Sequence, residues 1–360
     1  MIYPEFLHSG GRIGFIAPSY GCATEPYKSD FEEALEYFKS IGFRTVTGPN
    51  CFAELGTGIS NTPEKCAEEA YDFLVNDRSD VIISCGGGEL MCEILPYLDF
   101  DEIKKADPKW FMGYSDNTNL TFLLNTLCDR ASIYSLCSSK FSPGNWHECT
   151  GDAFDLLCGK KQKASNYPFW RKSVPEVTEC DGSAALDESY DLYVNKKTEE
   201  KYYLIPYKQY IYSGEHPAGS AHFSGRLTGG CLDILVTLVG TKFDRTMEFA
   251  EKYCDDGIIW FIESCDLSVM SMRRALWQME NAGWFKHVKG FLIGRPARFD
   301  DSFDGMDHYN AVTGILGKYN VPIIMDLDIG HLFPQMPIIS GACADVSADG
   351  NSFSMKYDLS

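Results

Sequence analysis

Hydrophobic positions in the first half of the chain alternate between short apolar runs and helical spacing. The apolar runs, each short enough for one buried strand, are RIGFIA (12–17), DVIISC (80–85) and WFMGY (110–114). Between them, Phe31, Ala34, Leu35 and Phe38 recur on one helical face, and Thr62-Pro63-Glu64 has the cap and proline of another helix start. Strands alternating with helices predict a parallel sheet with crossover helices, and therefore an α/β fold.

Regular patterning stops between about residues 160 and 225, in a polar stretch rich in aromatic residues, and then returns. The later elements are predicted helices over 229–240 and 268–283 and predicted strands over 257–263, 288–294 and 321–330. The tail at 342–358 predicts a hairpin around Asp349-Gly350. We therefore predict an N-terminal domain over 1–165, a linker over 166–182 and a C-terminal domain over 183–360, with an excursion extending to about residue 225.

Length and charge narrow the class of protein. A chain of 360 residues suits two domains of ordinary size. The net charge of −19, without clusters of lysine and arginine, argues against a nucleic-acid partner. The N-terminal segment has no basic start followed by a long apolar run, so we expect neither a signal peptide nor membrane association, and a cytoplasmic location.

Cysteines and histidines give no pattern typical of a metal site. The 14 cysteines are scattered singly without a C-x-x-C pair, which predicts reduced and mostly buried thiols. The seven histidines include no H-E-x-x-H motif, so the sequence does not indicate a metalloprotease. We therefore expect no metal.

One serine lies at a predicted corner between a strand and a helix. The segment Gly113-Tyr114-Ser115-Asp116-Asn117 precedes a helix whose leucines 120, 123, 124 and 127 share a face. Hydrolase elbows favour G-x-S-x-G, and this chain has Asn117 where the second glycine would stand. Two interpretations stay open: Ser115 is a nucleophile at a helix N-terminus, or it is an ordinary helix cap.

Three further features bear on that choice. The loop SCGGGEL (84–90) follows a strand, and its glycine amides can form part of an oxyanion hole, cradle a phosphate or simply make a tight turn. His331 follows an apolar strand, which makes it the histidine best placed to act as a base. Glu263 also ends an apolar strand, and a carboxylate there could orient the imidazole. Each residue alone has an ordinary structural explanation; together they favour nucleophilic catalysis.

Five segments, in their order along the chain, resemble the LD-carboxypeptidase family of serine peptidases, which includes the microcin-immunity peptidases. These segments are residues 13–21, 84–122, 224–241, 258–264 and 328–342. The resemblance implies a flavodoxin-like parallel-sheet N-terminal domain and a C-terminal domain with a swivelling β/β/α core. It also implies a homodimer that needs no metal or organic cofactor.

The resemblance assigns the family's catalytic roles to residues that are already identified above. The resemblance implies that Ser115 is the nucleophile, His331 the general base and Glu263 the residue that orients it. It further implies an oxyanion hole formed by the amides of Gly88, with Gly87, and Asp116. A carboxypeptidase must also bind a terminal carboxylate, and Arg226 and Arg295 are the candidate cations.

The resemblance leaves the substrate open. The first expectation is release of the terminal D-alanine from peptidoglycan-derived tetrapeptides, and the second is hydrolysis of aminoacyl or peptidyl nucleotide antibiotics. Aromatic residues in or near the excursion could stack on a nucleobase or could simply pack together: Trp146, Tyr167, Phe169 and Trp170. A hypothesis of another class is a non-catalytic module that binds a small anion at the glycine loop.

Overall fold

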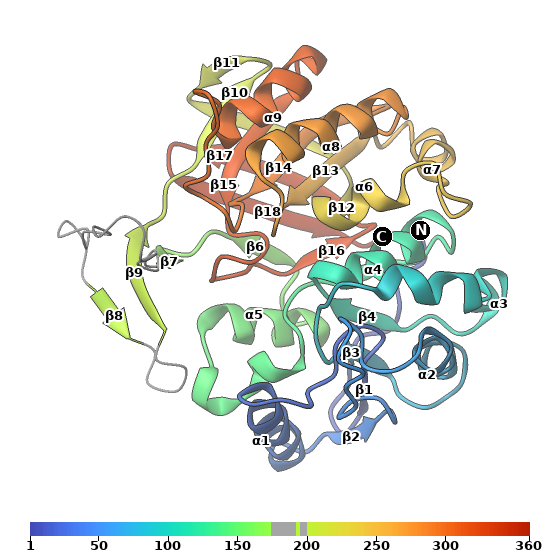
Figure 1. The fold of residues 1–360 in the computed structure, drawn as a ribbon. Coiled ribbons are helices and arrows are strands. Elements are labelled where there is room, and N and C mark those ends of the chain that lie inside the picture. The colour runs from blue at the N-terminus through green and yellow to red at the C-terminus, as the bar shows by residue number, and fades with distance from the viewer. Residues whose placement is uncertain (174–191, 195–199) are drawn as a thin grey trace.

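The computed structural model describes residues 1–173, 192–194 and 200–360, and leaves 174–191 and 195–199 undescribed. The predicted linker end at 182 and domain start at 183 lie outside the described residues. The chain folds into two halves, each built on its own β-sheet, and Figure 1 shows the N-terminal half below the C-terminal half.

The N-terminal half contains a six-stranded sheet in the order β16-β5-β4-β3-β1-β2. Its strands are β1 (Arg12–Ile16), β2 (Arg44–Thr47), β3 (Val81–Ser84), β4 (Trp110–Gly113), β5 (Ser132–Tyr134) and β16 (Ile338–Ser340). β1 to β5 are parallel, and β16 joins β5 in antiparallel orientation. The order 2-1-3-4-5 is that of flavodoxin-like folds, so the predicted fold of this half is confirmed.

Helices lie around this sheet, and the one predicted to start at Thr62-Pro63 begins there. They are α1 (Tyr27–Ser40), α2 (Pro63–Val75), α3 (Phe100–Lys105), α4 (Thr118–Thr126) and α5 (Glu148–Leu157). Thr62 is the N-cap residue of α2 and Pro63 its first residue. Phe31 and Phe38 of α1 are buried against Phe15 of β1. Burial of each such ring contributes roughly 1.5–3 kcal/mol, which fixes the face that α1 turns to the sheet.

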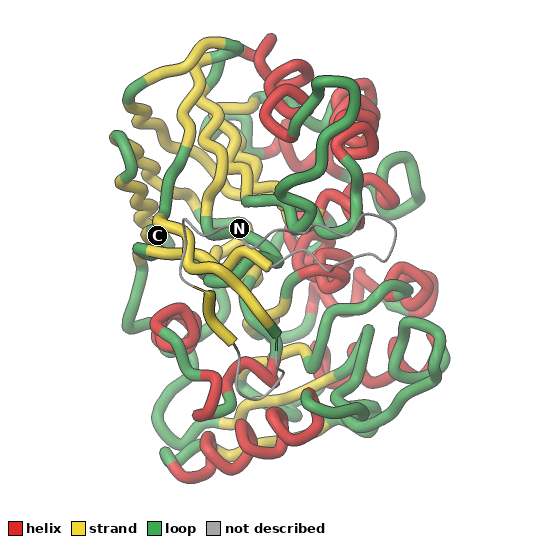
Figure 2. Tube along the Cα trace, turned by 60° about the vertical axis from the view of Figure 1, so that its left-hand side comes forward, coloured by secondary structure: helices red, strands yellow, loops and turns green. Residues whose placement is uncertain are grey.

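The C-terminal half contains a mixed nine-stranded sheet in the order β11-β10-β15-β14-β13-β12-β17-β18-β6. Its strands are β6 (Lys163–Ser165), β10 (Tyr210–Ser213), β11 (His216–Ala218), β12 (Ser220–Cys231), β13 (Ile258–Glu263), β14 (Val288–Gly294), β15 (Pro322–Leu327), β17 (Cys343–Asp349) and β18 (Ser352–Asp358). Its helices are α6 (Leu232–Leu238), α7 (Thr246–Lys252), α8 (Val269–Asn281) and α9 (His308–Leu316). Figure 2 shows these helices gathered on one face of the sheet. A mixed C-terminal sheet completes the predicted fold class.

The stretch interpreted as an irregular excursion is more ordered than its sequence suggests. β6, β10 and β11 extend the nine-stranded sheet, while β7 (Phe169–Ser173), β8 (Leu192–Val194) and β9 (Lys201–Pro206) form a separate sheet. Most residues of β7, β8 and β9 are exposed or half-buried. Because such strands have little apolar surface to bury, they lack the alternation from which strands are predicted.

The two halves meet along α4, which packs against β12 and α6 of the C-terminal half. The hydroxyl of Thr118, the first residue of α4, accepts a hydrogen bond from the Cys231 amide at 3.0 Å. The carboxyl ends of β1, β3 and β4 face this boundary, where parallel sheets bind ligands.

Within the described segments, no helix is long and apolar enough to cross a membrane. The same segments contain no cluster of side chains suited to hold a metal ion. Cysteines of the described ranges are free thiols, most of them buried.

Candidate active site

Ser115 stands on a strained turn between β4 and α4. A short 3₁₀ turn, η2 (Ser115–Asn117), connects the two elements, and Ser115 has a φ of 62°. This left-handed conformation is uncommon for a residue other than glycine, and strain of this kind is typical of nucleophile elbows. The Ser115 side chain makes no cap hydrogen bond to the helix. The structure therefore does not support the interpretation of Ser115 as an ordinary helix cap.

Asn117, which replaces the second glycine of the elbow motif, ties two loops together. Its side-chain amide donates to the Gly86 carbonyl at 2.8 Å and to the Tyr114 carbonyl at 3.0 Å. The amide thereby fixes the glycine loop after β3 beside the serine turn after β4. The Asn117 side chain is fully buried, so solvent does not compete for these two hydrogen bonds.

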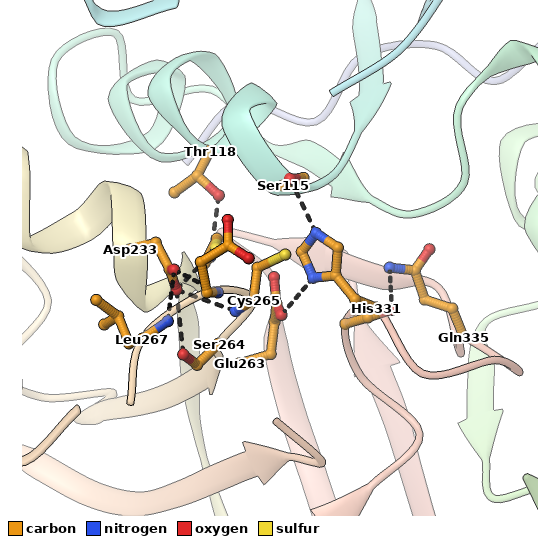
Figure 3. Close-up of polar contacts among 12 residues, drawn as sticks. Ser115, Thr118, Asp233, Glu263, Ser264, Cys265, Leu267, His331 and Gln335 are labelled. Carbon is orange, nitrogen blue, oxygen red and sulfur yellow. Dashed lines mark hydrogen bonds and ion pairs between the residues drawn. The ribbon is translucent and has the colours of Figure 1, made fainter. Parts of the chain in front are cut away.

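His331 and Glu263 reach Ser115 from the C-terminal half. The Ser115 Oγ lies 2.9 Å from His331 Nε2, and His331 Nδ1 lies 2.8 Å from Glu263 Oε2. Figure 3 shows the imidazole between the hydroxyl above it and the carboxylate below it. Glu263 ends β13, and His331 lies in the loop that follows β15. Three residues far apart in sequence thus form one continuous hydrogen-bonded chain.

Gly330 allows the imidazole and the carboxylate to approach. Its φ is 104°, and a Cβ atom on it would lie 2.5 Å from Glu263 Oε2. Any side chain at this position would collide with the carboxylate and require a backbone conformation that L residues avoid. The glycine immediately before His331 is therefore a structural requirement of the site.

The surroundings of His331 favour its charged form. Burial alone lowers the pKa of His331, but the Glu263 carboxylate, with help from the Cys265 side chain, outweighs burial and raises this pKa above its usual 6.5. Glu263 is fully buried, so little water screens its charge. This arrangement stabilises the imidazolium that forms when histidine takes a proton from serine.

Tyr134, at the end of β5, connects the nucleophile turn to the carboxylate and was missed at the sequence level. Its hydroxyl donates to Glu263 Oε1 at 2.5 Å and accepts from the Ser115 amide at 3.1 Å. Burial, followed by the nearby Glu263 charge, raises the pKa of Tyr134 well above 10, so the phenol keeps its proton. The sequence gives no signal for this role, because Tyr134 looks like any apolar strand residue.

Replacing Tyr134 with phenylalanine should slow the reaction and shift its pH profile. We expect kcat to fall roughly 10- to 100-fold, since one hydrogen bond to a buried charge is lost. Without the phenol donor, Glu263 holds the imidazolium more strongly, so the acidic limb of the profile moves to higher pH. Tyr357→Phe, which removes another buried hydroxyl that donates to Pro337, is the matched control. An unshifted acidic limb in Tyr134→Phe would contradict this role.

A second contact unseen in the sequence fixes the loop after Glu263. The Asp233 carboxylate accepts hydrogen bonds from the backbone amides of Cys265, Asp266 and Leu267 and from the Ser264 hydroxyl. Figure 3 shows Asp233 beside Ser264, Cys265 and Leu267. These contacts fix the backbone that carries Cys265, whose side chain contributes to the raised pKa of His331.

The candidate oxyanion donors lie at different distances from the serine. Gly87 faces it directly, because a Cβ atom there would lie 3.1 Å from Ser115 Oγ. A Cβ atom on Gly88 would instead lie 2.2 Å from Ser19 Oγ. In the part of the chain that is described, neither glycine amide has a hydrogen-bond acceptor. The Asp116 side chain points inward and accepts from the Met91 amide at 2.9 Å, while burial raises its pKa.

Comparison with known proteins places this geometry in a family. The LD-carboxypeptidase N-terminal domain matches residues 13–135, and the LD-carboxypeptidase C-terminal domain matches residues 224–346. The chain belongs to the LD-carboxypeptidase family. It is accordingly a serine hydrolase of that family, with the N-terminal match containing Ser115 and the C-terminal match containing Glu263 and His331.

Individual LD-carboxypeptidase relatives align over almost the whole chain. A carboxypeptidase-like protein from Vibrio cholerae is 24% identical over 99% of this chain and 98% of its own length. The Escherichia coli microcin C7 self-immunity protein MccF is 25% identical over 97% of this chain and 94% of its own. An MccF-like protein from Bacillus anthracis has the same fold, with a TM-score of 0.77, 20% identity and coverage of 99% and 100%.

The two arginines predicted to bind a substrate carboxylate both form ion pairs with carboxylates of this chain. Arg226 donates to Asp256 at 2.6 Å and is mostly buried. Arg295 is 1% exposed and pairs with the fully buried carboxylate of Asp328. Breaking a buried ion pair leaves one charge uncompensated, at a cost of about 3–5 kcal/mol. The Arg295 guanidinium cannot bind a substrate carboxylate without that loss, and Arg226 would first have to give up its hydrogen bonds to Asp256.

The aromatic residues considered for base stacking do not share one surface. Tyr167 and Trp170 are buried, and Trp170 lies under the Arg295 guanidinium at 5.0 Å. Trp146 packs against Tyr37. Phe169 is 48% exposed and Trp146 is 36% exposed, so both present surface to solvent. Tyr167 and Trp170 serve packing rather than recognition.

Proposed function

We propose that this LD-carboxypeptidase-family hydrolase is a cytoplasmic serine carboxypeptidase that removes the terminal D-alanine of peptidoglycan-derived tetrapeptides. The observation that carries the proposal is the continuous hydrogen-bonded chain from Ser115 through His331 to Glu263. The family match over both halves supports peptide bond hydrolysis as the reaction. We further propose that the enzyme acts as a homodimer and needs no metal or organic cofactor.

In the proposed mechanism His331 is the base and then the acid. Its Nε2 takes the Ser115 proton while Oγ attacks the scissile carbonyl, and Glu263 stabilises the resulting imidazolium. The backbone amides of Gly87, Gly88 and Asp116 donate hydrogen bonds to the carbonyl oxygen and stabilise the negative charge that develops on it. The imidazolium then donates its proton to the leaving amine as the carbon–nitrogen bond breaks. Water, deprotonated by the same histidine, releases the acyl group from Ser115.

A second candidate substrate is an aminoacyl or peptidyl nucleotide. The support is the similarity to MccF over nearly the full chain, together with structures of MccF in complex with aspartyl sulfamoyl adenosine (TM-score 0.74, 22% identity). The same serine chemistry would cleave the acyl bond of such a compound. Both candidates therefore share one mechanism and differ in the group that leaves.

A side-by-side turnover assay tests the proposal. The purified protein is incubated with a muropeptide tetrapeptide ending in D-alanine and, separately, with aspartyl sulfamoyl adenosine, and products are quantified by mass spectrometry. We expect release of D-alanine with the higher kcat/KM for the tetrapeptide. A higher kcat/KM for the nucleotide would select the second candidate. Binding of either compound without turnover, and without labelling of Ser115 by a fluorophosphonate, would instead favour a non-catalytic binding module.

A further inference from the structure

A cavity of about 350 Å³ adjoins Ser115 on the side of the N-terminal half. Gly87 and Tyr114 form the part of its wall nearest the reaction centre: Gly87 faces the serine, and the Tyr114 ring lies 5.2 Å from the His331 ring. The volume falls in the range of ligand sites and is sufficient for an amino-acid residue of a substrate. The cavity therefore borders on two residues, Gly87 and Tyr114, that adjoin Ser115 and His331.

One wall of the cavity carries a lysine that the assigned machinery does not use. Lys140 lies in the turn η3 (Ser138–Phe141), with Ser139 beside it on the same wall. The flanking residues Ser138 and Phe141 are fully buried, so the backbone of the lysine is held firmly. No carboxylate of the described segments forms an ion pair with Lys140. It differs in this respect from Arg226 and Arg295, whose charges are already compensated.

Charges around the site direct an anionic group toward this lysine. The carboxylate of Glu89, in the glycine loop, lies close enough to those of Asp266 and Asp233 in the C-terminal half that, after burial, their repulsion raises the pKa of Glu89. Glu54, on the cavity rim, is exposed and forms no ion pair with Lys140 in the described part of the chain. In a chain with a net charge of −19, a lysine on the cavity wall that forms no ion pair within the described residues is a favourable place for a carboxylate.

We propose that Lys140 recognises a carboxylate on a substrate residue that flanks the scissile bond, and that the cavity beside Ser115 holds that residue. The inference rests on the proposed function. It assigns to Lys140 the carboxylate-binding role that the sequence analysis predicted for Arg226 or Arg295. An ammonium is a compact charge with three donors, and the Ser139 hydroxyl on the same wall is a further donor. The carboxylate is either the terminal one of the leaving residue or a side-chain one on the acyl residue.

Steady-state kinetics of Lys140→Met with paired substrates tests this role. One pair is the tetrapeptide ending in D-alanine and its C-terminal carboxamide; the other is aspartyl and asparaginyl sulfamoyl adenosine. We expect Lys140→Met to raise KM for the acid of one pair roughly 10- to 100-fold, with kcat changed less than about threefold. KM for the matching amide should not change. The pair that responds identifies which carboxylate is bound.

Two further variants separate recognition from general charge effects. Lys140→Arg should retain most of the preference for the acid, because a cation remains in the cavity. Lys39→Met removes the same charge from the exposed face of α1, where Lys39 pairs with Glu36, and should leave KM unchanged. Equal loss for acid and amide in Lys140→Met, or no change for either acid, would overturn the proposal while leaving the serine mechanism intact.

Equilibrium binding keeps the test independent of turnover. Calorimetric titration of the Ser115→Ala protein with the same acids and amides measures recognition without chemistry. We expect an acid to bind more tightly than its amide, and the preference to disappear when Lys140→Met is added. Equal affinities, or binding of neither acid, would overturn the role of Lys140. Failure of the serine mechanism is recognised separately, as absence of both turnover and fluorophosphonate labelling in the unmodified enzyme.

Discussion

Ser115→Ala and His331→Ala should each reduce turnover by about 10⁴-fold or more. The first removes the atom that attacks the carbonyl, and the second removes the base that lies 2.9 Å from it. Turnover is measured with the tetrapeptide and with aspartyl sulfamoyl adenosine. Labelling by a fluorophosphonate should disappear in Ser115→Ala. Thermal melting of each variant checks that the fold is retained.

The double variant sharpens this prediction. Residues that act as one unit do not contribute independently, so Ser115→Ala combined with His331→Ala should be scarcely slower than either single variant. If the two effects multiplied, the residues would act separately, and the hydrogen bond between them would have no catalytic meaning. Activity close to that of the unmodified enzyme in either single variant would remove the assignment of nucleophile and base.

Glu263→Gln should reduce kcat roughly 10³- to 10⁴-fold near neutral pH and move the acidic limb of the pH profile to lower pH. The direction follows from the raised pKa of His331. The base works only when neutral, so activity appears as the pH rises through that pKa. Removing the Glu263 charge removes the main cause of the increase, so the neutral form appears at lower pH.

The large rate loss in Glu263→Gln has a separate geometric cause. Tyr134 donates to Glu263 Oε1, so a glutamine would keep its carbonyl toward the phenol and turn its amide group toward His331 Nδ1. The imidazole would then carry its proton on Nε2, where it cannot accept one from Ser115. Glu251→Gln, which alters an exposed pair with His287, is the matched control and should leave the profile unchanged. An acidic limb that stays in place or moves to higher pH would contradict the prediction.

Much of the fold could be predicted because its periodic elements are local. Phe31, Ala34 and Phe38 repeat at helical spacing, and all three are buried in α1. The hairpin around Asp349-Gly350 forms between β17 and β18. The strands within 160–225 escaped prediction because they are short or half-exposed, and two of them pair with strands far along the chain: β6 with β18, and β10 with β15.

The sequence by itself determined the two-sheet α/β architecture and presented Ser115, Glu263 and His331 as residues at the ends of strands, since strand ends follow from local hydrophobic period. Only the tertiary structure decided that these side chains lie within hydrogen-bonding distance, although Glu263 and His331 are 68 positions apart in the sequence and Ser115 and His331 are 216 positions apart. It also decided that Tyr134 joins them and that both arginines, unlike Lys140, form ion pairs with carboxylates of the described residues. Side-chain direction and charge pairing depend on packing between distant segments, and one-dimensional periodicity contains no information about such contacts.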